Sequence, residues 1–449
     1  MGFLRGENSP KTRCGAIIRK EGKKEKMQTR NIIQVEDKVP PRLLVPLSIQ
    51  HMFAMFGASV LVPFMLGISP AIVLFMNGIG TLLFILITKG RAPAYLGSSF
   101  AFIAPATLVI EQWGYPYALG GFVVVGLIGC ILAAIIYKCG TGWINVVLPP
   151  AAMGPVVALI GLELAGSAAS TGEIIGDSVT SSSVITFCVT LAVAVLGSVL
   201  FRGFLSVIPI LIAILCGYVT AVLTGVISGA DIMAALSTNF ISIPNFQLPK
   251  FDIEAILVIL PVILVIANEH IGHQLVTSKV VGRDLLKDPG LHRSLFADNF
   301  STALSGLIGS VPTTTYGENI GVMAITKVYS VRVIGGAAVL SIICSFVGPL
   351  AALIQTIPGP VIGGISFLLY GMIGTSGLRI LVDNQVDYSK NRNMVLTSVV
   401  FVVGLSGVTL SLGNVALSGM TLAAIVAMVM SLLFFAFDKL HWSNDAQDE

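Results

Sequence analysis

The chain has 449 residues, of which 55% are hydrophobic and only 11% are charged, and its formal net charge is +3. Soluble domains carry about 25% charged residues, so this composition excludes a soluble protein and indicates an integral membrane protein surrounded by a lipid bilayer. The small net charge gives no reason to expect nucleic acid as a partner. None of the six cysteines forms a CxxC pair, so neither a disulfide framework nor a zinc site is predicted.

The N-terminal stretch differs in kind from the rest. Residues 1–41 are polar and basic, show no apolar periodicity and lack the apolar core of a signal peptide. We expect a disordered cytoplasmic tail here.

Fourteen apolar segments follow in chain order, each about the length of a membrane span or slightly shorter. The first seven are residues 43–66, 70–88, 93–110, 116–137, 144–165, 183–201 and 205–227. The second seven are residues 253–276, 295–309, 311–326, 331–354, 358–379, 394–411 and 415–437. The sequence therefore predicts an all-α polytopic membrane protein with fourteen transmembrane segments in two sets of seven.

Loop charge gives the orientation of these segments. Lys and Arg gather in every second loop, with Lys250 as the exception. Because positive loops stay inside, we expect a multi-pass protein of the cytoplasmic membrane with both termini cytoplasmic. Seven spans per set give the two sets opposite orientations, as in inverted-repeat transporters. Faint similarities in matching order, such as "YLGSSFAF" with "TTYGENIG", agree with such 7+7 inverted repeats.

The third and tenth segments, "PAYLGSSFAFIAP" and "PTTTYGENIGV", are rich in Gly, Ser, Thr and Pro. Irregular backbone in contact with lipid leaves amides unsatisfied at several kcal/mol each, so these segments must be buried in protein and face a cavity. Interrupted segments at corresponding positions of two halves predict a transporter binding site.

Ionisable side chains inside the membrane sharpen this prediction. Glu269 and His273 lie four residues apart, on one face of the eighth segment, and Glu318 lies in the broken tenth segment. Such residues default to a functional role because their insertion costs roughly 3 kcal/mol or more. A purely structural Glu–His pair remains the alternative. The order is EHxxH and not the HExxH of zinc enzymes, so no metal is expected, and no nucleophile elbow indicates a hydrolase.

The chemistry of these groups restricts the ligand. Carboxylates accept N–H bonds, and free amides at broken helices donate to carbonyl oxygens. A planar cyclic imide such as uracil or an oxopurine offers both patterns, whereas an anion would be repelled by the two acids. A channel or anion exchanger would have no use for such facing carboxylates.

Longer motifs add a resemblance. "QHMFAMFGASVLVP", "GLELAG", "DPGLHRS" and "TTYGENIGVMAITKVYS" resemble the nucleobase–ascorbate transporter family, also called nucleobase–cation symporter family 2, and within it the bacterial uracil permeases. The match covers about residues 40–440. The resemblance implies a core domain (43–140 and 253–356), a gate domain (141–227 and 357–440), short β-strands in the broken segments 3 and 10, and a homodimer through the gate domain.

The resemblance also implies roles for individual residues. Glu269 and Glu318 would hold the uracil N–H groups, and His273 would hydrogen-bond Glu269 in a proton relay. The remaining implied residues are the amides of Phe100 and Gly317 on the uracil carbonyls, Tyr316 and Tyr370 lining the pocket, His51 bracing the third segment, and Ser99 and Asn319 beside the site. For Tyr370, ordinary packing in the gate domain is equally open.

The expected function is uracil–proton symport by alternating access, the core sliding against the gate, with the proton as coupling ion and no cofactor. Purine members of the family commonly carry Gln where Glu318 stands, which favours uracil. A xanthine or other oxopurine symporter of the same fold, or sodium coupling, remains the alternative. The protein is not expected to be an enzyme.

Overall fold

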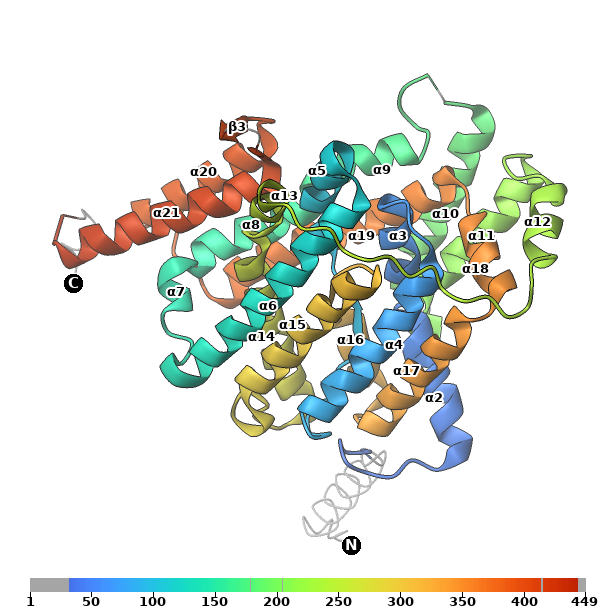
Figure 1. Ribbon diagram of the computed structural model, residues 1–449, viewed down its shortest axis with the longest axis horizontal. Helices are drawn as coiled ribbons and strands as arrows, with labels where there is room; N and C mark the ends of the chain where they lie inside the picture. The colour runs from blue at the N-terminus through green and yellow to red at the C-terminus, as the bar shows by residue number, and fades with distance from the viewer. Residues whose placement is uncertain (1–31, 178, 204, 413–414, 443–449) are drawn as a thin grey trace, which may run out of the picture.

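The structure is a computed structural model that describes residues 32–177, 179–203, 205–412 and 415–442. Its chain is mostly helical (Figure 1). Within the described residues, eight helical segments are long and apolar enough to cross a membrane, and four shorter apolar helices accompany them. The predicted multi-pass membrane protein is therefore confirmed.

The first half of the chain is a run of helices interrupted by one short strand. Proline in the first turn starts several of these helices, where its missing N–H has no partner to lose. The elements are α2 (Pro41–Ala54), α3 (Phe56–Met65), α4 (Pro70–Ile87), β1 (Leu96–Ser98), η1 (Phe100–Phe102), α5 (Ile103–Trp113), α6 (Tyr115–Cys139), α7 (Ile144–Val147), α8 (Pro150–Glu163), α9 (Ala165–Thr171), α10 (Ser181–Leu200), η2 (Leu205–Val207), α11 (Pro209–Leu223) and α12 (Gly229–Leu236).

The second half of the chain also has a short strand before a short helix, and two further strands precede its last helix. Its elements are α13 (Ile253–Ile259), α14 (Val262–Val281), η3 (Leu286–Gly290), α15 (Leu291–Ile308), β2 (Thr313–Thr315), α16 (Gly317–Thr326), α17 (Val331–Ser345), α18 (Gly348–Gln355), α19 (Gly359–Asp383), α20 (Asn391–Leu405), β3 (Thr409–Leu412), β4 (Val415–Ser418) and α21 (Gly419–Lys439).

Three of the predicted segments differ from the structure. The end of the segment predicted at 394–411 and the start of the one predicted at 415–437 form an antiparallel hairpin of β3 and β4. Helix α20 ends just before Gly407, because the φ of 72° at this glycine is left-handed. The segment predicted at 331–354 is two helices, α17 and α18, separated at residues 346–347.

The end of the predicted tail is attached to the rest of the chain. Residues 1–31 lie outside the described part, but the segment 32–40 pairs with residues 327–331. The amide of Ile33 donates to the Lys327 carbonyl (3.1 Å), and the amide of Val331 donates to the carbonyl of Val35 (3.0 Å), whose side chain is fully buried. The polar composition of this segment hides the docking, in which the Val35 side chain is buried.

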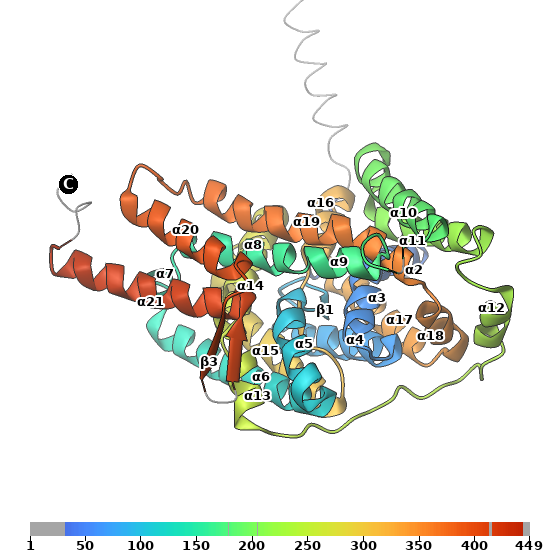
Figure 2. The ribbon, with the colours of Figure 1, turned by 90° about the horizontal axis from the view of Figure 1, so that it is seen from above.

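The helices form two groups that lie side by side (Figure 2). In one group α6 packs along α15, and α4 and α2 pack along α17; in the other, α8 packs on α19 and α20, and α10 packs on α11 and α19. Small residues allow the closest approach. A side chain at Gly126 of α6 would collide with the backbone of Asn299 and Ala303 in α15, which is how helices associate where lipid removes the hydrophobic driving force.

A two-stranded ribbon lies within the first group of helices. Antiparallel β1 and β2 pair Leu96 with Thr315 and Ser98 with Thr313. The outer edge of each strand is satisfied by a threonine: the amide of Leu96 donates to Thr81 Oγ1 (2.9 Å), and the amide of Thr313 donates to Thr302 Oγ1 (3.2 Å). These hydroxyls let a sheet with two open edges exist at membrane depth.

Candidate functional site

Two helix N-termini begin directly where the ribbon strands end. Helix η1 starts at Phe100, two residues after β1, and α16 starts at Gly317, two residues after β2. The first amides of a helix have no partner within that helix and carry partial positive charge. The ribbon therefore presents two sets of N–H donors inside the protein, a suitable lining for carbonyl or carboxylate oxygens.

The two acids predicted for the site come from different elements and lie near each other. Glu318 is the second residue of α16, and Glu269 lies on α14, which packs against α16 and β2. Their carboxylates interact electrostatically with each other, and both interact with the Tyr316 hydroxyl. Both acids are half-buried. Two like charges in such surroundings need donors or a proton to be stable.

Aromatic side chains border these acids. The ring of Phe100 lies 6.4 Å from that of Tyr316 and 6.5 Å from that of Tyr370, measured between centroids. Tyr316 is oriented by its hydroxyl, which donates to the carbonyl of Ser98 at 2.5 Å. The Tyr370 hydroxyl is buried, and Ser366 of the same helix lies close to it. Its helix, α19, belongs to the second group of helices, so both groups reach the site.

His273 has a different partner from the one expected. Among the described residues no hydrogen bond joins it to Glu269; its Nδ1 lies 3.2 Å from Thr315 Oγ1 instead. Thr315 Oγ1 in turn lies 3.3 Å from His270 Nδ1, and His270 Nδ1 lies 3.4 Å from Asp298 Oδ2. Glu269 and His273 lie one turn apart on α14. The strand β2 lies close enough to α14 for the hydroxyl of Thr315 to bond the imidazole of His273.

Asp298 and His270 were missed as site residues. Asp298 is 2% exposed on α15 and interacts electrostatically with Glu269. In the sequence, Asp298 lies in the stretch "ADNFST", beside Asn, Ser and Thr. Such a stretch is equally typical of the polar end of a helix, so it does not single out a site residue. Among the described residues no group of three or more His, Cys, Asp or Glu side chains is arranged to hold a metal ion.

His51 contacts the tenth segment, not the third as expected. The Asn319 side-chain amide donates to His51 Nδ1 (3.1 Å) and to its carbonyl (3.2 Å). This contact fixes α16 against α2. Ser99 supports the ribbon through its backbone, since its amide donates to the Pro312 carbonyl (2.9 Å), while its buried hydroxyl has no partner within the described chain.

One face of the helix that carries Glu318 is not covered by other parts of the described chain. Gly317, Gly321 and Ile325 are exposed along one face of α16, and Gly272 is exposed on α14 beside it. This face runs from the acids to the end of α16 at Thr326, next to Lys327. This end of α16 lies next to the described N-terminal segment, since the amide of Ile33 donates to the Lys327 carbonyl.

Comparisons with known proteins agree with this architecture. A family model described as "Permease family" matches residues 42–413. The chain is 53% identical to a uracil permease of Escherichia coli (strain K12), with 90% of this chain and 94% of the relative covered. It is 51% identical to a uracil permease of Paenibacillus larvae (92% and 99% covered) and 46% identical to one of Bacillus subtilis (89% and 94%).

Solved structures share the fold at low identity. The transmembrane domain of a cyanobacterium bicarbonate transporter, BicA, aligns with a TM-score of 0.57 at 15% identity, covering 89% of this chain and 98% of that one. The murine anion transporter Slc26a9 in its inward-facing state aligns with a TM-score of 0.67 at 10% identity, covering 89% and 69%. The family match and the close relatives together establish that this chain belongs to the permease family and is a transporter, not an enzyme.

Proposed function

We propose that the protein imports uracil together with protons across the cytoplasmic membrane. The observation that carries the proposal is the meeting of Glu269 and Glu318 beside the helix N-termini at Phe100 and Gly317. Close relatives named uracil permease support this substrate.

Uracil fits the donors and acceptors of the site. Its two N–H groups are flanked by carbonyl oxygens, so each carboxylate accepts one N–H while helix-terminal amides donate to the carbonyls. Glu269 would take one N–H group and Glu318 the other, and the rings of Phe100 and Tyr316 would cover a face of the base. Tyr370 would close the pocket from the second helix group.

Proton coupling follows from the same acids. A carboxylate left without substrate inside the membrane is costly, so it binds a proton or keeps the site in contact with water. Glu269 would exchange its proton along the turn that leads to His273, Thr315 and His270, with buried Asp298 at the far end. Binding of substrate and proton together would neutralise the site and permit its movement.

The architecture we propose is a fourteen-segment fold of two inverted repeats. This proposal is supported by similar hydrogen bonds to the two strands of the ribbon. Thr81, from the helix before β1, accepts from the amide of Leu96, and Thr302, from the helix before β2, accepts from the amide of Thr313. The neighbours Gly80 and Ser301 also contact each other. The helix group around the ribbon would be the core domain, and the group of α8, α10, α11, α19, α20 and α21 the gate domain.

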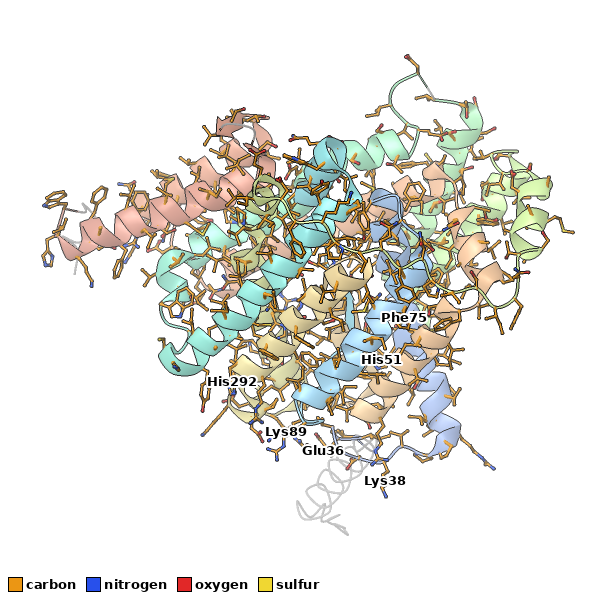
Figure 3. All side chains as sticks on the ribbon, in the orientation of Figure 1. Glu36, Lys38, His51, Phe75, Lys89 and His292 are labelled. Atoms are coloured by element: carbon orange, nitrogen blue, oxygen red, sulfur yellow. The ribbon has the colours of Figure 1, made fainter. Side chains whose placement is uncertain are left out.

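Alternating access would then be an elevator-like movement of the core against the gate. Both termini would be cytoplasmic, since Glu36, Lys38, Lys89 and His292 lie along the same edge of the molecule (Figure 3) and positive loops stay inside. The exposed face of α16 ends at this edge, which would suit an inward-open state. We also propose a homodimer through gate-domain helices, testable by the mass of the solubilised protein.

The decisive experiment is uptake of labelled uracil into vesicles that contain only this protein. We expect accumulation when an inward-directed proton gradient is imposed, no dependence on sodium, and recovery of chemically intact uracil. Competition by excess xanthine as strong as by unlabelled uracil would identify an oxopurine symporter instead. Accumulation that needs a sodium gradient would overturn proton coupling, and a current without substrate would indicate a channel.

A further inference from the structure

A groove lies between α4, α6 and α15, and none of its lining residues is among those proposed to bind the substrate. Its volume is about 270 Å³. Its walls include the side chains of Ile87, Ala134 and Phe296, so they are largely apolar. The lining also includes Tyr137, His292 and Arg293, near the end of α6 and the start of α15. The groove thus combines largely apolar walls with a basic end, where α15 begins.

The surface around the groove is suited to lipid. Leu127 and Ile131 on α6 are 51% and 60% exposed, and Phe300 on α15 is 38% exposed. Side chains of this kind on membrane-spanning helices face the hydrocarbon. Tyr137 is 68% exposed, and its ring contacts that of His292 at 4.5 Å, an arrangement typical of the membrane interface, where aromatic and basic residues gather.

Arg293 is the group that the fold leaves without a counter-ion. It is half-buried, yet no hydrogen bond or ion pair to it is found in the described part of the chain. The nearby acids have other partners: Asp288 pairs with Arg91 at 2.7 Å, and Asp284 accepts the amide of Leu286 at 3.1 Å. The N-terminus of α15 adds partial positive charge at the same point.

We propose that this groove binds an anionic phospholipid of the cytoplasmic leaflet, with one acyl chain in the groove and the phosphate on Arg293. The proposal rests on the orientation given under Proposed function. Basic pockets between transmembrane helices on the cytoplasmic side bind anionic headgroups, and the apolar walls match an acyl chain. A free phosphate would leave those walls unused, and a neutral lipid would leave the arginine unpaired.

Native mass spectrometry of the solubilised full chain tests the proposal by counting bound lipid. The probes are phosphatidylglycerol and phosphatidylcholine with identical acyl chains, and glycerol phosphate as the headgroup alone. We expect phosphatidylglycerol to bind, and Arg293→Gln to weaken it about fivefold, the contribution of one basic residue at the surface. Ala134→Trp fills the groove and should reduce binding at least as much.

The matched controls are Lys138→Gln, which removes a cation at the same helix end outside the groove, and Leu127→Trp, which adds the same bulk elsewhere on α6. Both should bind phosphatidylglycerol like the unmodified chain. Equal affinity of Arg293→Gln, equal binding of phosphatidylcholine, or glycerol phosphate binding as tightly as the lipid would each overturn the proposal. The readout needs no uracil, so its failure is distinct from a failure of transport.

Discussion

Acidic residues occupy two contrasting regions of this molecule. Inside the helical body, Glu269 and Glu318 interact electrostatically, and neither forms an ion pair within the described residues. At the rim, Glu36 and Asp288 pair with Arg283 and Arg91 at 2.7 Å. The rim acids sit in water and their pairs contribute about 1 kcal/mol or less. The central acids lie in surroundings of low dielectric constant, where a carboxylate without hydrogen-bond donors is unfavourable. A ligand with N–H groups would supply these donors.

The largest effect is expected where the substrate would replace the missing partner. Glu318→Ala removes a charged acceptor worth about 1.5–3 kcal/mol, so uracil affinity should fall about tenfold to a hundredfold. Equilibrium binding of labelled uracil to the solubilised protein measures this. The rim variant Glu36→Ala is the control and should bind normally. Equal affinity of the Glu318 variant and the unmodified chain would remove this acid from the pocket.

Glu269→Gln should separate binding from coupling. The amide oxygen still accepts an N–H group, so binding should weaken by less than in the Glu318 variant, while proton-driven accumulation should disappear because the side chain no longer titrates. Uptake with a proton gradient, compared with uracil exchange at equilibrium, distinguishes the two. Full accumulation by this variant would assign coupling to another group, with Asp298 as the first candidate.

A smaller effect is expected at the scaffold that holds the central acids. Thr302→Val keeps the shape but removes the hydroxyl that bonds both the amide (3.2 Å) and the carbonyl (2.8 Å) of Thr313. The unsatisfied strand edge should cost about 1–3 kcal/mol of stability. Thermal unfolding of the solubilised protein measures the loss, and Thr302→Ser should restore most of it. A valine variant with unchanged unfolding would show that the edge is satisfied in another way.

The smallest effect is expected at the rim. The hydrogen bond from Arg283 holds the pKa of Glu36 below its ordinary value. The contact is therefore fully present above the ordinary pKa of a glutamate, about 4.3, and is lost as the pH falls through the lowered pKa. Glu36→Gln should loosen the segment 32–40 by less than about 1 kcal/mol. Limited proteolysis between pH 3 and 7 tests this, and an unmodified chain with pH-independent protection would contradict it.

The sequence alone drew attention to the two segments rich in Gly, Ser and Thr and to Glu269 and Glu318. Runs of glycine, serine and threonine inside an apolar chain are unfavourable in the membrane unless other parts of the protein enclose them. An unpaired glutamate in the membrane is equally unfavourable, so its presence indicates a functional role. These arguments need no knowledge of the neighbours, and β1, β2 and Glu318 do lie in the segments they identified.

The contacts that could not be predicted from the sequence are those between segments far apart in the chain. The bonds of Thr302 to β2, of Asn319 to His51 and of His273 to Thr315 join elements whose contact no local pattern reveals. Asp298 was passed over because polar residues near a helix end are ordinary. The docking of Val35 was hidden by its charged neighbours, since one apolar residue gives no periodicity.

The β1–β2 ribbon has a consequence for biogenesis. Its strands are separated by more than 200 positions in the chain, so the first half of the protein enters the membrane with a strand edge that has nothing to pair with. That edge stays unfavourable until translation delivers the second strand. A nascent chain stopped before residue 313 should thus remain incomplete at its centre, and quality-control proteases would have a ready means of recognising it.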